Sequence, residues 1–150
     1  MTQAAHQPLE IGEVRRQLRL AIEEARRAAA AHRQEADEAA RSFESLLEHV
    51  AVPLFRQFTT ALRGERMLFR VVTPAASVRI EAERSADNFL ELALDTERRP
   101  VALVLRRGHT RGHHIYNDDR VVAEGADLSA VSPSVLLASL MDAVAPFIER

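Results

Sequence analysis

The sequence predicts an α+β fold in which a long N-terminal helical arm precedes an antiparallel β-meander of four to six strands and a C-terminal helix packed on the sheet. Two observations indicate this order: apolar residues recur at helical spacing through the first third of the chain, and at every second position through its middle. We expect residues 1–8 to be disordered, residues 9–52 to form one amphipathic helix, and residues 53–150 to form the α+β domain. A chain of 150 residues can bury a core of ordinary size.

The N-terminal segment carries apolar or small residues at steps of three and four. They are Ile11, Val14, Leu18, Ile22, Ala25, Ala29, Ala36, Ala40, Phe43, Leu47, Val50 and Leu54. The mean step is close to ~3.6, which favours a straight amphipathic helix or a helical hairpin over a long left-handed coiled coil. A single helix from Pro8 to Val52 would be roughly 65 Å long, more than twice the diameter of a small domain.

The excess length of this helix must pack on something. The alanine-rich part, residues 25–40, contains no Gly or Pro at which the chain could turn back. We therefore expect the helix to pair with another copy of the protein as a homodimer. The expected oligomer interface consists of Ile11, Val14, Leu18, Ile22, Ala25 and Ala29.

Pro53 is the first residue expected to break this helix. It should kink the helix or start a second one over residues 54–63, which Gly64 would end as its C′ residue. The second helix carries Phe55, Phe58 and Leu62 and should dock on the sheet.

The spacing of apolar residues changes to two after Arg66, which predicts strands at residues 67–72, 77–82, 88–94 and 101–106, followed by a short hairpin of 113–116 with 120–123. The short connections are rich in turn formers, so consecutive strands should pair antiparallel. We expect Asn117-Asp118-Asp119 to form the last turn. Further on, Ser132 as N-cap and Pro133 as first helical residue precede an apolar helix that can cover the sheet.

Composition excludes several classes of chemistry. The chain has no cysteine and, by inspection, no lysine, so thiolate nucleophiles, Cys-ligated zinc and Schiff-base catalysis are excluded. A general coding bias that favours Arg and Ala explains the missing lysine better than a need for guanidinium groups. The polar N-terminus lacks the pattern of a signal peptide, and no apolar run is long enough for a bilayer, so we expect a cytoplasmic protein without membrane contact.

The densest group of chemically active side chains lies in residues 106–119. His109, His113 and Asp118 are the candidates there for a metal site or for acid–base catalysis, because imidazole and carboxylate groups bind zinc and iron. The spacing does not favour such a site, since adjacent histidines point to opposite faces of a strand. No recognised catalytic motif appears, and we expect no cofactor.

Residues 98–120 also contain the one local excess of positive charge, with the formal charge of the whole chain at −2. Its six arginines are the candidate anion- or partner-binding residues: Arg98, Arg99, Arg106, Arg107, Arg111 and Arg120. Nucleic-acid contact through this strip is an alternative, although Tyr116 is the lone aromatic residue there that could stack on a base. The plainer interpretation is a solvated strand face whose arginines are balanced by glutamates on neighbouring strands.

Three functional hypotheses follow. The favoured one is a non-enzymatic interaction or adaptor module that dimerises through its helix and binds a macromolecular partner. We expect this partner to be a protein. A chaperone-like role is one version of this hypothesis. The second is a small ligand- or metal-binding domain, enzymatic in one version, that uses the hairpin of residues 109–119. The third is nucleic-acid contact through residues 98–120.

Overall fold

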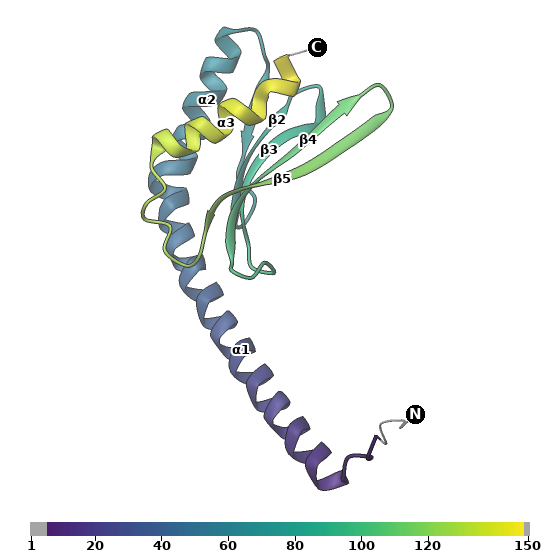
Figure 1. Cartoon of the computed structure of the whole chain (residues 1–150). Coiled ribbons are helices and arrows are strands. Elements are labelled where there is room, and N and C mark those ends of the chain that lie inside the picture. The colour runs from purple at the N-terminus through teal and green to yellow at the C-terminus, as the bar shows by residue number, and fades with distance from the viewer. Residues whose placement is uncertain (1–5, 149–150) are drawn as a thin grey trace. The chain divides into compact units, whose positions relative to one another are not determined.

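The computed structural model describes residues 6–148 and confirms the α+β fold. Its elements are α1 (Ile11–Leu46), a π-helical turn η1 (Leu47–Ala51), α2 (Val52–Gly64), β1 (Phe69–Val72), β2 (Ser77–Ala82), β3 (Ser85–Asp95), β4 (Ala102–Arg111), β5 (His114–Glu124) and α3 (Pro133–Ile148). The contacts divide the chain into two compact units, residues 1–34 and residues 35–150. Figure 1 shows the order of these elements along the chain.

The first unit consists, over its described residues, of a short segment without regular structure and the N-terminal part of α1. Helix α1 begins at Ile11, and residues 6–10 form neither helix nor strand. The expected disorder of residues 1–8 falls mostly on residues 1–5, which lie outside the described residues.

The second unit begins at Glu35, so residues 35–52 of the helical segment belong to the compact unit that contains the sheet. The reason is that Ala39, Phe43 and Leu46 of α1 are buried, and Phe43 and Leu46 belong to the main apolar core.

The sequence predicts a break at Pro53, and the structure has a π-helical turn just before it, which is followed directly by α2. Proline has no N–H, and in a regular α-helix its ring meets the carbonyl of the residue four positions earlier. The wider turn η1 places its hydrogen bond between the N–H of Val52 and the carbonyl of Leu47, five positions apart. Pro53 then stands in the first turn of α2, where its missing N–H costs nothing.

Helix α2 ends in a Schellman motif, but its left-handed residue is not Gly64 as expected. Gly64 is the last helical residue, and Arg66 has the positive φ of 63°. The N–H of Arg66 donates to Arg63 O, and the N–H of Met67 donates to Leu62 O, which are the two hydrogen bonds of this motif. A non-glycine residue at this position gives no signal in the sequence.

The sheet is a five-stranded antiparallel meander in the order β1-β2-β3-β4-β5. The expected bounds of β2 are confirmed, and β3 and β4 are longer than expected. The predicted short hairpin around Asn117-Asp118-Asp119 is wrong. The turn is Gly112-His113, with Gly112 at φ 64°, and Arg111 pairs with His114 on either side of it.

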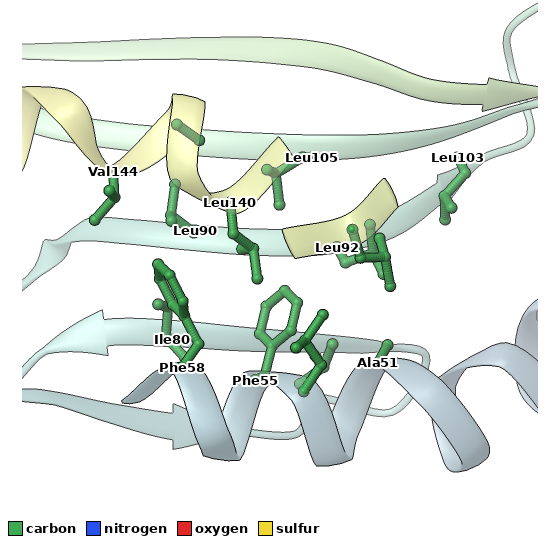
Figure 2. Close-up of a cluster of buried hydrophobic side chains, with 14 of the residues drawn as sticks. Ala51, Phe55, Phe58, Ile80, Leu90, Leu92, Leu103, Leu105, Leu140 and Val144 are labelled. Atoms are coloured by element: carbon green, nitrogen blue, oxygen red, sulfur yellow. The ribbon is translucent and has the colours of Figure 1, made fainter. Parts of the chain in front are cut away.

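The second unit has one apolar core between the sheet and its helices. Helices α2 and α3 lie against one face of the sheet (Figure 1), and Ser132 caps α3 through a hydrogen bond from the N–H of Val135 to its Oγ, as expected. Figure 2 shows side chains of α2, of α3 and of strands β2, β3 and β4 meeting in this core. The largest fully buried members include Phe55, Ile80, Leu90, Leu92 and Leu140.

Candidate interaction surfaces

Helix α1 exposes the apolar residues that the sequence assigned to an oligomer interface. The exposed fractions are 68% for Ile11, 42% for Val14, 57% for Leu18 and 41% for Ile22. We call the row formed by Ile11, Val14, Leu18, Ile22, Ala25 and Ala29 the α1 stripe. A row of large apolar side chains on one side of a helix is rarely left exposed to water.

The α1 stripe continues along the same helix into residues that are buried. Steps of three and four lead from Ala29 through His32 and Ala36 to Ala39, Phe43 and Leu46, and these last three are buried. One amphipathic pattern therefore runs through α1, and the sheet unit covers its C-terminal part. Its N-terminal part, residues 11–25, is exposed.

The polar side of α1 is stabilised by ion pairs within the helix. Arg16 binds Glu13 at 2.7 Å, and Arg27 lies 3.8 Å from Glu23. Hydrogen bonds from Arg16 and then from Gln17 lower the pKa of Glu13. Such pairs between residues three or four positions apart support an exposed helix, so the side of α1 away from the stripe is suited to solvent.

Arg107, one of the arginines proposed for anion binding, lies on β4 and faces α3. Its guanidinium donates Nε to Asp118 Oδ1 at 2.9 Å, Nη2 to Asp118 Oδ2 at 2.6 Å and Nη1 to the carbonyl of Ala143 at 3.2 Å. Next to it, Arg120 of β5 pairs with Asp142 of α3 at 3.1 Å. Through these contacts, the two arginines connect strands β4 and β5 to α3.

The other candidate arginines are spread over two ends of the sheet. Arg98 pairs with Asp95 at 3.1 Å in the β3–β4 loop, and Arg106 lies 3.9 Å from Asp119 across the opposite face of the sheet. Arg99 is exposed in the same loop as Arg98, and Arg111 is exposed beside the Gly112-His113 turn. The strip of residues 98–120 thus forms no single cluster of uncompensated arginines.

The three metal candidates do not converge. His109 stacks on Tyr116 with ring centroids 5.0 Å apart, His113 stands in the turn, and Asp118 holds Arg107. Within residues 6–148 no group of three or more His, Asp or Glu side chains could hold a metal ion. The Nδ1 atom of His109 is buried and makes no hydrogen bond among the described residues.

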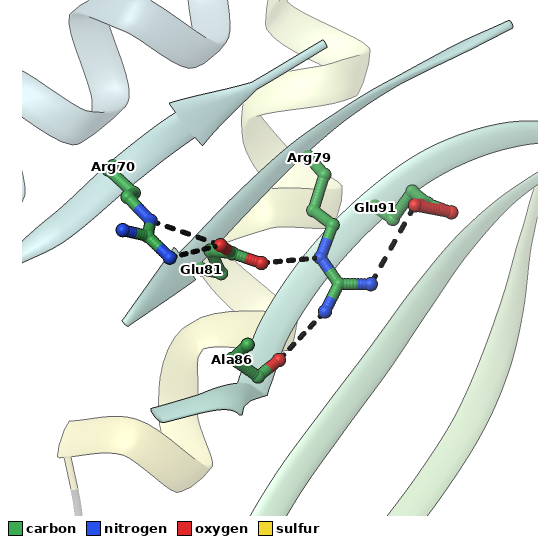
Figure 3. Close-up of polar contacts among 5 residues, drawn as sticks. All are labelled: Arg70, Arg79, Glu81, Ala86 and Glu91. Atoms are coloured by element: carbon green, nitrogen blue, oxygen red, sulfur yellow. Dashed lines mark hydrogen bonds and ion pairs between the residues drawn. The ribbon is translucent and has the colours of Figure 1, made fainter. Parts of the chain in front are cut away.

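The sheet face opposite α2 and α3 carries an alternating row of charges, shown in Figure 3. Glu81 accepts hydrogen bonds from Arg70 at 2.7 Å and from Arg79 at 3.1 Å, and Arg79 also lies 3.8 Å from Glu91. Arg79 donates a further hydrogen bond to Ala86 O at 2.7 Å. We call these four charged residues, Arg70, Glu81, Arg79 and Glu91, the charge ladder.

The strand register extends the charge ladder toward β5. Arg79 pairs with Glu91, Glu91 with Arg106, and Arg106 with Asp119, so the signs alternate across four strands. Opposite charges on neighbouring strands stabilise the sheet and cancel each other's field. Of the six candidate arginines, Arg106 belongs to this arrangement, where Glu91 and Asp119 flank it. The face is balanced in charge, but it is not fully solvated, because Glu81 is buried.

A further surface, which the sequence reasoning missed, is an apolar groove between α2 and α3. It has a volume of about 550 Å³ and is lined by Phe58, Ala61, Leu62, Glu65, Met67, Met141, Val144, Phe147 and Ile148. Met141 and Ile148 are 56% and 60% exposed. We call it the α2–α3 groove.

One signal in the sequence could have revealed this groove. Helix α3 is apolar on almost every side, with Val135, Leu137, Met141 and Ile148 exposed in addition to its core residues. A surface helix normally carries polar residues on its outer side, and one that is apolar all round is expected to be covered on both sides.

No family model matches the chain, and no similarity to a curated protein or to a solved structure is found. None of the helices within residues 6–148 combines the length and the apolar character that crossing a bilayer requires. The geometry described above therefore carries the functional inference.

Proposed function

We propose that the protein is a non-catalytic interaction module that assembles with a second copy of itself through the α1 stripe and binds a protein partner with its α+β domain. The observation that carries this proposal is the exposure of Ile11, Val14, Leu18 and Ile22 in one row of a helix. The same amphipathic pattern is covered where α1 joins the sheet unit, so its exposed part is suited to a second helix of the same kind.

Burial of the α1 stripe against a second helix is energetically more favourable than its exposure to water. Burial of a Leu, Ile or Val side chain contributes about 1.5–3 kcal/mol when it is complete, and roughly half of that for side chains exposed by about half. Two copies would together bury the four large stripe residues twice, along with the alanines Ala25 and Ala29. Small alanine side chains add little area but let two helices approach closely.

The α2–α3 groove supports the partner-binding part of the proposal. Its lining is apolar and its rim residues Met141 and Ile148 are exposed. Methionine is flexible and polarisable, which suits a surface that adapts to an apolar segment of another protein. The proposed partner for the groove is therefore a protein segment with apolar side chains.

The assembly can be tested on the full-length chain by light scattering at micromolar concentration. Leu18→Glu places a charge in the α1 stripe, whereas Leu20→Glu places it on the opposite side of the helix. Leu18 and Leu20 are 57% and 54% exposed, so the two variants are closely matched. We expect the parent chain and the Leu20→Glu variant to be dimeric, and Leu18→Glu to weaken the dimer by about a hundredfold or more.

Two results would speak against the proposal. A monomeric parent chain would exclude assembly through α1 under these conditions. An equal effect of both variants would show that the α1 stripe is not the contact and that a charge anywhere on the helix alters its folding. Circular dichroism of each variant separates loss of helix from loss of assembly.

A further inference from the structure

The two flanks of the α1 stripe differ in the sign of most of their charged residues. In an α-helix, the residue that follows a stripe residue lies on one flank, and the residue that precedes it lies on the other. Of the charged residues that follow a stripe residue, Arg15, Arg19 and Arg26 are basic, whereas Glu23 is acidic and already pairs with Arg27. Arg33 lies on the same flank one turn beyond Ala29. On the other flank the residues that precede the stripe include Glu10, Glu13 and Glu24 and no arginine.

The two flanks also differ in the contacts that they already make. No ion pair of Arg15, Arg19, Arg26 or Arg33 is present among the described residues, and all four are exposed. The ion pairs of α1 use Arg16 and Arg27, which lie toward the side away from the stripe. The arginine flank therefore holds its charges free for a neighbour, and on the other flank Glu10 and Glu24 are exposed.

The direction of a second helix decides which flanks meet. When two identical helices pair in parallel, the flank after the stripe of one copy faces the flank before the stripe of the other. When they pair antiparallel, each flank faces its own counterpart. Antiparallel pairing would thus bring the arginines of both copies together, whereas parallel pairing places them beside the flank that carries glutamates and no arginine.

We propose that two copies of α1 pair in parallel, so that the arginine flank of each helix faces the glutamate flank of its partner. This inference rests on the proposed assembly through the α1 stripe and adds its direction. Glu10 is five residues before Arg15, which is the separation at which flanking charges of two parallel helices meet.

Single cysteines can test the direction, because the chain contains no cysteine of its own. Val14→Cys and Ala25→Cys place one thiol near each end of the α1 stripe, about 16 Å apart along the helix. Leu20→Cys is the control, with its thiol on the opposite side. Each full-length variant is oxidised under mild conditions after light scattering of the reduced protein has given its mass.

Parallel pairing predicts a disulfide between copies for Val14→Cys and also for Ala25→Cys, because every stripe residue then meets its own counterpart. In an antiparallel pair at most one of these positions meets itself, and the other is separated from its counterpart by about 33 Å. The Leu20→Cys variant should stay uncrosslinked over the same time.

The possible results separate the two proposals. A dimer in which both stripe variants crosslink supports parallel pairing. A dimer in which one or neither crosslinks overturns the parallel direction and leaves the assembly intact. A chain that is monomeric before oxidation overturns the assembly and the direction together. Crosslinking of Leu20→Cys at the same rate as the stripe variants would indicate random collision and would also overturn the inference.

Discussion

Arg107 and Asp118 face each other across strands β4 and β5, and their side chains form two parallel hydrogen bonds of 2.9 and 2.6 Å. Arg107 is the less exposed of the two and also donates to Ala143 O of α3. We expect Arg107→Ala to lower the free energy of unfolding by about 1–2 kcal/mol, measured by urea denaturation. Arg111→Ala, two residues further along β4, should change it by less than about 0.5 kcal/mol. Equal effects would contradict the assigned role of Arg107.

Gly108 is the position in the sheet least able to accept a side chain. A Cβ atom there would overlap the ring of Phe89 on β3 and lie 2.8 Å from Asp87 O. The Arg79 guanidinium lies over the same ring, with its Cζ atom 3.8 Å from the ring centroid. The Phe89 ring therefore has little freedom to move. We expect Gly108→Ala to lower the free energy of unfolding by about 1–3 kcal/mol. At Gly12, where no atom lies within 4 Å of the added Cβ, the same substitution should not destabilise the protein.

Glu35 accepts a hydrogen bond from the backbone N–H of Val101 at 2.7 Å. Val101 is completely buried, so removal of the carboxylate leaves its N–H without this acceptor. We predict that Glu35→Ala lowers the free energy of unfolding by about 1–3 kcal/mol and that Glu35→Gln, which keeps an acceptor oxygen, loses less. Glu38→Ala is the matched control because Glu38 is exposed. Identical stabilities of the Ala and Gln variants would argue against the hydrogen bond.

Arg66 holds a backbone conformation that favours glycine, with φ at 63°. Glycine adopts this conformation without the steric cost of a Cβ atom, so Arg66→Gly should raise the free energy of unfolding by about 1 kcal/mol. Glu65→Gly is the control: Glu65 has φ −93°, and glycine there should only add flexibility to the unfolded chain. Thermal denaturation compares the two, and a lower melting temperature for Arg66→Gly would count against the Schellman assignment.

The α2–α3 groove should bind small apolar probes. We expect an environment-sensitive fluorescent dye to bind the native chain, and Met141→Glu to weaken this binding severalfold, since Met141 lines the groove. Val135→Glu changes another exposed apolar residue of α3 that does not line the groove, and it should have little effect. If both variants behave alike, the dye reports the general apolar character of α3 and not the groove.

Local pattern was sufficient to predict most of the architecture. Val78 and Ile80 alternate with Arg79 and Glu81, and this alternation gave the bounds of β2 because one face of that strand is buried and the other carries charges. Ser132 and Pro133 likewise marked the start of α3, since both signals act on the first turn of the helix itself.

The errors lie where a distant residue overrides a local preference. Asn117, Asp118 and Asp119 prefer turns, yet they continue β5 because Asp118 and Asp119 lie opposite Arg107 and Arg106 of β4. The α2–α3 groove was missed for a similar reason: its lining comes from two helices far apart in the sequence and from Glu65 and Met67 between α2 and β1. The residues of the α1 stripe, in contrast, could be listed from their spacing alone, although the spacing does not tell which part of the helix the sheet unit covers.

The π-helical turn η1 also determines where the helical segment can lose a residue. Deletion of one residue from an α-helix rotates everything beyond it by about 100°. This rotation would expose buried side chains to solvent. At η1 the buried face instead passes from Leu46 to Ala51 in a step of five, so shortening this turn to four residues would keep Phe43 and Phe55 on the core. Pro53 is the one obstacle, because its ring fits the wider turn. Deletion of Val50 together with Pro53→Ala is therefore the length change that this segment should tolerate best, and η1 has the character of a one-residue insertion accommodated without disturbing the helix on either side.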